Sequence, residues 1–281
     1  MPENDPRDLP LLEVRDLEVS FPLAGEWTPV VCGVSLAVGR GELLGLVGES
    51  GSGKSLTALA VLGLVPPPGR VRGGHVRLAG AGGPADLLTL PLREMRRVRG
   101  GRIGMVFQEP ASAFDPVYTI GFQIAEAVRA HHRISPREAR DEAVRLLDRV
   151  ALADARRRLG DYPHQLSGGQ RQRAMIAMAL AGGPDLLLAD EPTTGLDVTL
   201  QAQVLELLED LRRDLGLSVL LITHDLGVVA ETCDRVVVMR AGRVVEEAEV
   251  SALFRAPVHP YTRELLAALP RLPSSPRGLG R

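Results

Sequence analysis

Hydrophobic and polar residues alternate near the start of the chain and then give way to a run that is apolar throughout. Residues 11–21 alternate between the two kinds, which predicts a strand with one buried face. Residues 30–38 are expected to pair with it as the second strand of a hairpin, with residues 24–29 as the connection. Residues 43–47 are uniformly apolar, as is typical of a strand covered on both faces.

The middle of the chain changes from strand-like to helical periodicity. Short strands are expected at residues 75–78 and 102–107, and helical patterns follow at residues 120–132 and 136–152. One face of the second helix is apolar and consists of Ala139, Ala143, Leu146 and Val150. This stretch therefore predicts a helical insert or subdomain.

Helices and strands alternate again after residue 165. The expected elements are a helix at 171–181, strands at 185–190, 218–223 and 235–239, a turn at Ala241-Gly242, and helices at 198–214 and 261–269. Asp197 is the expected N-cap of the helix at 198–214, whose inward residues are Val204, Leu208, Leu211 and Leu215. This alternation predicts an α/β fold with a parallel sheet.

Composition limits the classes of protein that fit. A formal net charge of −2 gives no general attraction to nucleic acid. Two cysteines, Cys32 and Cys233, are too few for a disulfide framework or a cysteine-rich metal site. No apolar run approaches the roughly 20 residues of a membrane helix, and the charged, Pro-rich residues 1–10 do not form a signal peptide. We expect a soluble protein that meets a membrane only through a partner.

A glycine-rich segment between the strand at 43–47 and a helical pattern fits the phosphate-binding loop G-x-x-x-x-G-K-S. Its residues are Gly48, Glu49, Ser50, Gly51, Ser52, Gly53, Lys54 and Ser55, and the helical pattern comprises Leu56, Leu59 and Leu62. The glycines allow backbone N–H groups to surround an anion. Lys54 can reach the β- and γ-phosphates of a nucleotide, and the Ser55 hydroxyl can hold Mg²⁺. Lys54 is also the only lysine of the chain, consistent with a site that a planar guanidinium does not fit.

Two carboxylates close the strand at 185–190. Asp190 stands where ligands collect in open α/β sheets, and it is expected to hold Mg²⁺ through water. Glu191 is placed to orient or deprotonate an attacking water. Such a pair can also merely cap the next turn, but beside a phosphate loop we favour the catalytic interpretation.

A Ser-Gly-Gly turn at the start of a helix provides a second anion site. The segment is Leu166, Ser167, Gly168, Gly169 and Gln170. Two phosphate sites far apart in one chain are explained if each nucleotide lies between two subunits. The segment closely resembles the LSGGQ signature of the ABC-type ATPases, and the resemblance extends from residue 11 to about residue 269.

The resemblance implies further roles. Gln108 matches the glutamine that senses Mg²⁺ and the attacking water, and that links to a membrane partner. His224 matches the switch histidine at the γ-phosphate. The stretch Thr194-Gly195-Leu196-Asp197 resembles the D-loop, which crosses the dimer interface. Phe21 resembles the aromatic that stacks on adenine, although Trp27 lies nearby and a core role for Phe21 is an equal alternative.

The implied fold is a P-loop NTPase (RecA-like) α/β core with an N-terminal antiparallel β subdomain and an α-helical subdomain. The expected boundaries are a flexible segment at 1–10, a core at 11–108 and 171–250 with the helical subdomain at about 109–170, and a C-terminal helix and flexible tail at 256–281. The expected activity is ATP hydrolysis with Mg²⁺.

Three segments resemble the peptide/nickel importer ATPases: residues 105–110, residues 162–165 and the His-Pro-Tyr-Thr at 259–262. This implies two transmembrane permease subunits, a second ATPase subunit (a copy or a paralogue), an extracytoplasmic solute-binding protein and a location on the cytoplasmic face of the inner membrane. The expected cargo is di- or oligopeptides, with nickel or another solute as the alternative. No cysteine follows Cys233, so we expect no iron–sulfur cluster.

Two other classes of phosphate-loop protein are alternatives to a transporter subunit. Soluble ABC ATPases of DNA repair or translation usually carry coiled-coil arms, zinc cysteines or two ATPase units, none of which the sequence shows. A phosphate-loop kinase or GTPase would need no LSGGQ. The arginines at 93, 96, 97, 99 and 102 lack interleaved aromatics, so a solvated face is favoured over nucleic-acid binding.

Overall fold

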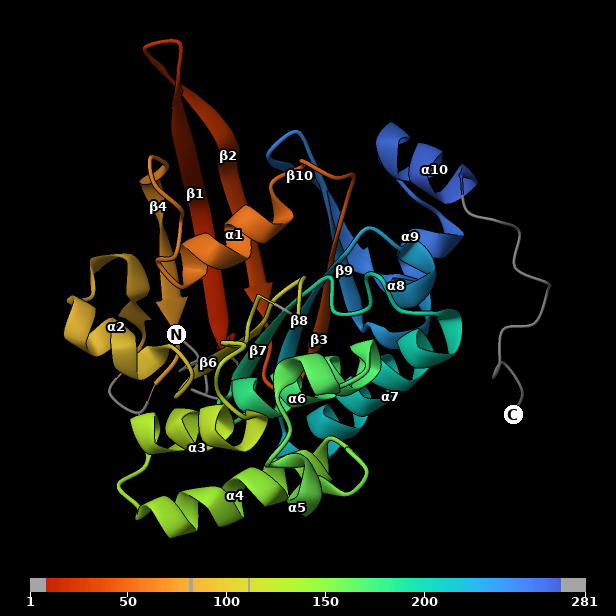
Figure 1. Cartoon of the computed structure of the whole chain (residues 1–281). Helices are drawn as coiled ribbons and strands as arrows, with labels where there is room; N and C mark the ends of the chain where they lie inside the picture. The colour runs from red at the N-terminus through yellow and green to blue at the C-terminus, as the bar shows by residue number, and fades with distance from the viewer. Residues whose placement is uncertain (1–8, 81–82, 111, 269–281) are drawn as a thin grey trace.

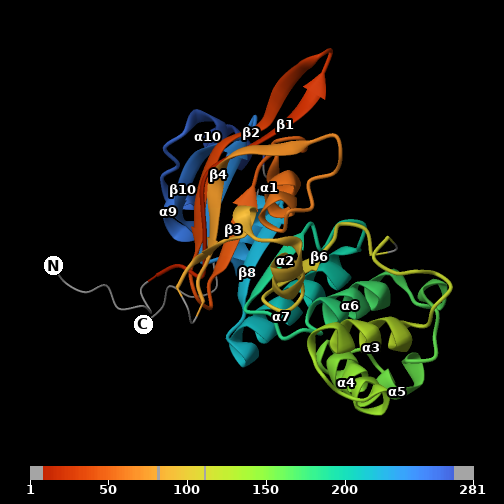
Figure 2. The same cartoon turned by 90° about the vertical axis from the view of Figure 1, so that its left-hand side faces the viewer.

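A computed structural model describes residues 9–80, 83–110 and 112–268. Within these ranges the chain forms an antiparallel sheet, a mostly parallel sheet, and a group of helices at the far end of the parallel sheet (Figures 1 and 2). Of the segments expected to be flexible, residues 1–8 and 269–281 lie outside the described residues. The predicted α/β class with an antiparallel subdomain is confirmed.

The antiparallel sheet has the strand order β2-β1-β4-β5. Its strands are β1 (Leu12–Leu23), β2 (Glu26–Val38), β4 (Arg70–Leu78) and β5 (Ala85–Asp86). The predicted hairpin forms, but its predicted connection at 24–29 is wrong. The turn is only Ala24-Gly25, because both residues have positive φ (50° and 88°), which lets Leu23 pair directly with Glu26.

The core sheet has the order β10-β9-β3-β8-β7-β6. Its strands are β3 (Leu43–Val47), β6 (Ile103–Val106), β7 (Leu186–Asp190), β8 (Ser218–Thr223), β9 (Arg235–Arg240) and β10 (Arg243–Glu249). All neighbours are parallel except β9 and β10, which form a hairpin. The sequence analysis placed the Ala241-Gly242 turn but missed β10, which carries three glutamates, of which Glu246 is half-buried and Glu247 and Glu249 are exposed. The parallel strands β3, β6, β7 and β8 all end at one edge of the sheet, which is where the site is built.

Opposite faces of the core sheet contact different layers. In β7, Leu186 and Leu188 pack with the residues of the antiparallel sheet, whereas Leu187 and Ala189 pack with the helices. All four side chains are fully buried. Burial on both faces explains the unbroken apolar runs of β3, β7 and β8.

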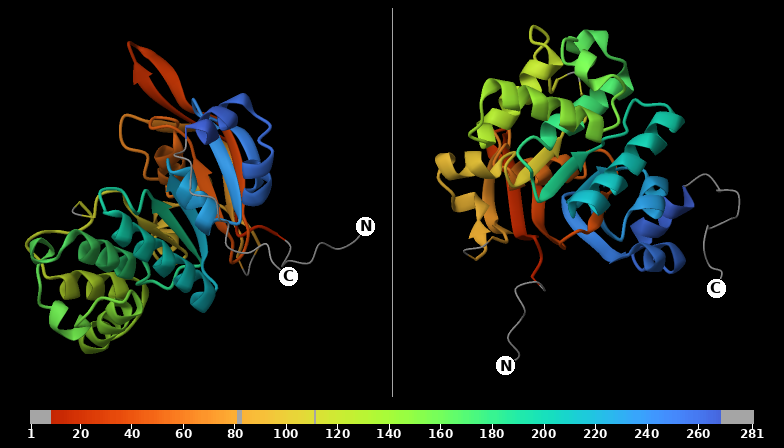
Figure 3. Two further views of the ribbon diagram at one scale, coloured as in Figure 1. Left: turned by 90° about the vertical axis from the view of Figure 1, so that its right-hand side faces the viewer. Right: turned by 90° about the horizontal axis from the view of Figure 1, so that it is seen from below.

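Helices cover this sheet and form the group beyond it. They are α1 (Lys54–Val61), α2 (Leu92–Val98), α3 (Ile120–His131), α4 (Pro136–Arg149), α5 (Ala155–Arg158), α6 (Gly168–Ala179), α7 (Val198–Leu215), α8 (Leu226–Thr232), α9 (Val250–Arg255) and α10 (Pro260–Ala267). Short 3₁₀ turns lie at Leu87–Thr89 and Pro163–Gln165. Figure 3 shows α3, α4 and α5 standing apart from α9 and α10. We propose the domain division stated above because α3, α4 and α5 fall within its helical part.

The helices α4 and α7 begin at the capping residues in their sequences, but not every residue predicted to face inward is buried. Ser135 and Glu138 form a capping box at α4, whose predicted apolar face is buried. Asp197 caps α7 as predicted, although Leu215 is 42% exposed and not inward. In α1, Thr57, Ala58, Ala60 and Val61 are buried. Of the leucines of the helical pattern, Leu62 is buried at the end of the helix, Leu56 is half-buried and packs against the core, and Leu59 is half-buried.

Two arginines from the cluster expected to be solvated have structural partners. Arg99 donates to the carbonyl oxygens of Leu62 and Gly63, at 2.8 Å and 3.0 Å, and so caps the end of α1. Arg102 contacts Ala79 and Asp185. These two arginines therefore connect separate parts of the fold, although the cluster was expected to be solvated. Among the described residues, no helix combines the length and apolar character that a membrane crossing requires.

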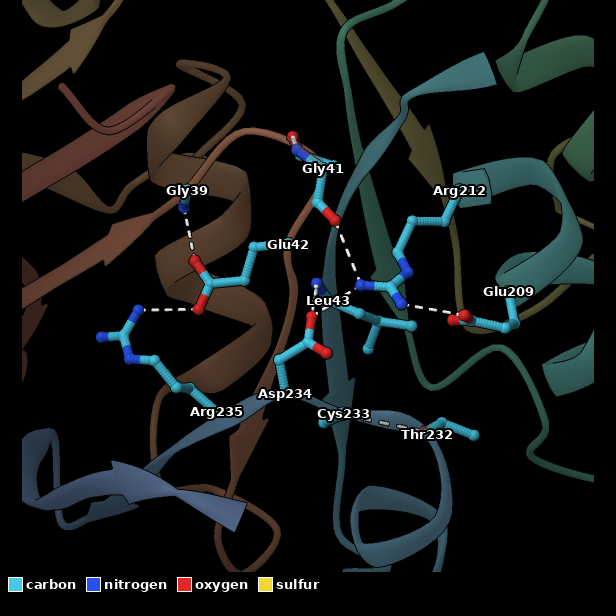
Figure 4. Close-up of polar contacts among 11 residues, drawn as sticks. Gly39, Gly41, Glu42, Leu43, Glu209, Arg212, Thr232, Cys233, Asp234 and Arg235 are labelled. Atoms are coloured by element: carbon cyan, nitrogen blue, oxygen red, sulfur yellow. Dashed lines mark hydrogen bonds and ion pairs between the residues drawn. The ribbon is translucent and has the colours of Figure 1, made fainter. Parts of the chain in front are cut away.

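A charged network ties the starts of β3 and β9 to the end of α7 (Figure 4). Arg212 donates to Gly41 O at 3.1 Å and to Asp234 Oδ2 at 2.7 Å, and Asp234 also accepts from Leu43 N at 2.9 Å. Glu209 accepts the remaining Arg212 bond at 2.8 Å. Arg212 thus joins α7 to the segments that lead into β3 and β9. It stabilises the end of the core sheet that lies opposite the site.

We predict that Arg212→Ala lowers the free energy of unfolding by about 1–3 kcal/mol, because charge-assisted hydrogen bonds to Gly41 and Asp234 are lost together. The neighbouring Arg213 is a matched control, since its side chain is 65% exposed and pairs only within α7, with Asp210. Arg213→Ala should change stability by no more than about 0.5 kcal/mol. Urea unfolding followed by circular dichroism measures both, and equal losses in the two variants would contradict the bracing role.

Candidate nucleotide site

The glycine-rich loop joins β3 to α1 at the carboxyl edge of the core sheet. Gly48 has φ +152°, and a Cβ there would lie 2.1 Å from Met239 O. Gly53 has φ +98° and stands at the N-terminal end of α1. Only glycine meets both demands, because the first site has no space and the second needs a left-handed backbone. The loop is therefore held in a tight arc between β9 and α1.

Lys54 lies inside this arc. Its side chain is buried, and Nζ donates to Gly48 O at 2.7 Å and to Glu49 O at 2.9 Å. Burial lowers the pKa of Lys54, and the carboxylates of Glu191 and Asp190 oppose that shift. The ammonium is therefore paired with carbonyl oxygens of the loop itself.

Asp190, the last residue of β7, meets the loop at its other end. Its Oδ1 accepts a hydrogen bond from Ser55 Oγ at 2.8 Å, although the two residues are far apart in the chain. Asp190 is only 6% exposed, and this burial is the main cause of its raised pKa. The sequence analysis expected both residues at a cation, and the structure brings their oxygens together.

Glu191 follows at once, with an unusual backbone. Its φ is +46°, a left-handed conformation that costs a non-glycine residue about 1–3 kcal/mol. The Glu191 N–H donates to Ile222 O of β8 at 2.8 Å, which holds this turn against the next strand. Strain at this position therefore aims the carboxylate out of the sheet edge.

Three side chains converge on the Glu191 carboxylate. Oε2 accepts from Thr194 Oγ1 at 2.7 Å and from Gln108 Nε2 at 3.4 Å, and Oε1 lies 3.2 Å from His224 Nδ1. Burial raises the pKa of Glu191, but hydrogen bonds from Thr194 and His224, with the charge of Lys54, outweigh it and lower the pKa. The carboxylate is therefore ionised at neutral pH.

The sequence analysis missed the role of Thr194, which it placed only in a D-loop-like stretch. Its spacing of three residues after Glu191 was the available signal, because a tight turn brings such a hydroxyl back to the carboxylate. The Thr194 N–H also donates to Glu191 O at 3.1 Å, which confirms that turn.

These residues surround a cleft of about 400 Å³. Its walls are Gly48, Glu49 and Ser50 of the loop, together with Gln108, Glu191 and His224. Leu265 of α10 completes the lining. The cleft thus gathers the ends of β3, β6, β7 and β8, with an unexpected contribution from the C-terminal helix.

The Ser-Gly-Gly turn lies elsewhere. Ser167 caps α6, accepting from Gln170 N at 3.3 Å while its own N–H donates to Gln170 Oε1 at 3.0 Å. Ser167 and Gly168 are exposed, whereas Gly169 packs against Leu200. None of these residues is among those that line the cleft of the same chain. Ser167 and Gly168 are therefore accessible from solvent, away from the residues that line the cleft.

Phe21 and Asp197 have local partners. Phe21 is half-buried and packs against the hydrophobic core, with its ring over Gly69. It is not one of the residues that line the cleft, so the observed contacts favour the core alternative. Asp197 accepts from Leu200 N at 3.0 Å as the cap of α7.

Known proteins share both the sequence pattern and the fold of this chain. Residues 31–194 match the ABC transporter family. The chain is 55% identical over 271 residues to a Sinorhizobium fredii protein named as a peptide ABC transporter ATP-binding protein, covering 96% of this chain and 79% of that one. It is 53% identical over 263 residues to a Brucella abortus protein named as a peptide import ATP-binding protein, covering 94% and 78%.

Solved structures agree. The ATP-binding cassette MJ0796, described as a dimer in a post-hydrolysis state bound to ADP and Pi, superposes with a TM-score of 0.74 and 29% identity, covering 85% of this chain and 98% of that one. CbiO1 from Clostridium perfringens, part of an ABC transporter complex, gives 0.73 and 26%, covering 93% and 96%. The chain belongs to the ABC transporter family and is an ATP-binding, ATP-hydrolysing cassette of that family.

Proposed function

We propose that this cassette powers the import of small peptides through a membrane complex. The observation that carries the proposal is the similarity, over nearly the whole chain, to relatives named as peptide import ATP-binding proteins. The segments at 162–165 and 259–262 support the same assignment. The cassette binds two transmembrane permease subunits at the cytoplasmic face of the inner membrane, with a solute-binding protein on the other side.

The proposed binding step uses the loop from Gly48 to Ser55. The amides of the loop and the N-terminus of α1 surround the β-phosphate. Lys54 Nζ exchanges its bonds to Gly48 O and Glu49 O for bonds to β- and γ-phosphate oxygens. This exchange replaces existing hydrogen bonds, so it leaves no buried ammonium unpaired.

The proposed hydrolytic step uses Glu191. A water placed between the γ-phosphate and the carboxylate gives its proton to Glu191 as its oxygen attacks phosphorus, and the bond to the bridging oxygen of ADP breaks. Thr194, Gln108 and His224 fix the direction of the carboxylate. His224 and Gln108 are exposed, so both can also reach the γ-phosphate and the attacking water.

A second ATPase subunit completes the proposed site. The Ser167 turn of one copy is exposed and points at no phosphate loop of its own chain, so it is free to close on the nucleotide of its partner. The stretch that ends at Asp197 lies beside the Ser167 turn of the same chain, and both face the partner subunit in the proposed dimer. MJ0796, which shares the fold, is described as dimeric. Nucleotide binding between the two subunits favours the closed pair, and hydrolysis opens it.

The residues at the loop also fit Mg²⁺. The Ser55 hydroxyl, the Asp190 carboxylate and the Gln108 amide oxygen are hard oxygen ligands. In the described residues no group of three or more His, Cys, Asp or Glu is arranged to hold a metal. When bound, Mg²⁺ neutralises charge on the β- and γ-phosphate oxygens.

Glu191→Gln should lower the rate of ATP hydrolysis roughly 10²–10⁴-fold while leaving ATP affinity nearly unchanged, because the amide keeps the shape but cannot accept the proton. The same variant should accumulate as an ATP-dependent dimer in light scattering. Glu206→Gln, an exposed position on α7, is the control and should behave as wild type. Near-normal turnover in Glu191→Gln would remove Glu191 from the catalytic role.

Uptake of a labelled dipeptide tests the cargo in cells that carry Glu191→Gln in place of the wild-type gene. We expect uptake to fall with hydrolysis. Loss of nickel uptake with normal peptide uptake would indicate that the cargo is nickel and not peptides. Normal uptake of both, with no membrane association when the permeases are co-expressed, would favour a soluble non-transport ATPase.

Asp190→Asn should separate stability from cation binding. Because burial raises its pKa, the folded protein holds the Asp190 proton more tightly than the unfolded chain. Ionised Asp190 therefore lowers the free energy of unfolding at pH values above its pKa in the folded protein. This destabilisation disappears as the pH falls below the pKa of the unfolded chain. At neutral pH the neutral amide should leave the Tm of the empty protein unchanged or higher, yet abolish the further rise caused by ATP with Mg²⁺.

Differential scanning fluorimetry measures both Tm effects. Asp185→Asn is the control, because Asp185 lies beside the opposite end of β7 and is about half exposed. It should keep the full Tm rise with nucleotide and Mg²⁺. A normal rise in Asp190→Asn would exclude Asp190 as a cation ligand.

A further inference from the structure

The His-Pro-Tyr-Thr segment at 259–262 has no role in the steps above, yet it lies against the site. It forms the start of α10, outside the residues that match the family. Figure 1 shows α10 at the same end of the core sheet as the loop that leads into α1. Its position raises the question of what this helix does to the nucleotide loop.

Tyr261 connects the two directly. Its side chain is 1% exposed, and its hydroxyl oxygen accepts a hydrogen bond from Glu49 N at 3.1 Å. The Arg240 guanidinium at the end of β9 lies 4.6 Å from the ring centroid. One turn further along α10, Leu265 lines the cleft. Helix α10 thus contacts both the loop and the space it encloses.

The helix is held in place independently of any nucleotide. Glu246 of β10 accepts hydrogen bonds from Val258 N at 2.7 Å and His259 N at 2.9 Å. His259 Nδ1 in turn accepts from Tyr261 N at 3.2 Å and caps the helix. These bonds anchor the first turn of α10 to the core sheet, so the Tyr261 hydroxyl has a fixed position.

The peptide group that Tyr261 holds is the first of the loop. The Glu49 N–H bonds to Tyr261, and the Glu49 carbonyl accepts from Lys54. The preceding residue, Gly48, is pressed against Met239 O of β9. The entry to the loop is therefore fixed from outside by β9 and α10. Burial raises the pKa of Tyr261, so the hydroxyl stays neutral at pH 7 and the bond persists.

We propose that Tyr261 is a positioning residue of the phosphate loop, which holds the Glu49 amide so that the loop is ordered before the triphosphate arrives. The inference rests on the proposed binding of nucleotide at this loop. An ordered loop binds ground state and transition state equally well, so its loss raises KM and leaves kcat unchanged. A purely structural tyrosine would change stability and leave KM alone.

Tyr261→Phe is the decisive variant, because it keeps the ring in its apolar cluster and under Arg240, and removes only the oxygen. We expect KM for ATP, and Kd measured with a fluorescent ATP analogue, to rise about 2- to 10-fold, the ratio that corresponds to one net hydrogen bond. The kcat should stay within about 2-fold of wild type. Tyr118→Phe, at an exposed tyrosine before α3, is the matched control and should change neither quantity.

Lys54→Ala separates failure of this inference from failure of the proposed site. If Lys54→Ala loses ATP binding but Tyr261→Phe binds as wild type, the positioning role is overturned and the site stands. If Lys54→Ala binds ATP normally, both fail. A rise in KM for Tyr261→Phe with wild-type Tm supports the inference. A lower Tm with unchanged KM overturns it in favour of a packing role.

Discussion

The structure depends on one geometric constraint, the common edge at which parallel strands end. The strands β3, β6, β7 and β8 each supply one part of the site within a few residues of that edge. Because parallel strands must be joined by crossovers, these parts are far apart in the chain and meet only when the sheet is complete. The apolar strands therefore do more than form a core, since their register decides which side chains share the cleft.

The charged groups at this edge hydrogen-bond to neutral groups of the same chain. Lys54 bonds to loop carbonyls, Ser55 to Asp190, and Thr194 to Glu191. Buried charges without partners are costly, and each of these three charged groups has a partner within the chain. These bonds give the site a fixed arrangement, and the left-handed backbone at Glu191 is part of that arrangement.

Elements outside the residues 31–194 that match the family support both ends of these strands. At the far end of the strands, Arg212 and Asp234 tie α7 to β3 and β9. At the site end, α10 is held by Glu246 and in turn contacts the loop through Tyr261. The C-terminal part of the chain thereby forms an additional wall of the cleft, which gives it a physical means of influencing nucleotide binding.

The sequence by itself determined the features whose causes are local. The phosphate loop between β3 and α1, the Ser167 turn that starts α6 and the Asp197 cap of α7 each depend on residues within a few positions, so their patterns were readable. The apolar runs of the buried strands were readable for the same reason, whereas β10 was not. Only the tertiary structure decided that Gln108 and His224 converge on Glu191, that Phe21 packs against Gly69 and that Tyr261 reaches Glu49. Most of those contacts join residues far apart in the chain, and strand order and helix packing, which no local pattern encodes, bring them within bonding distance.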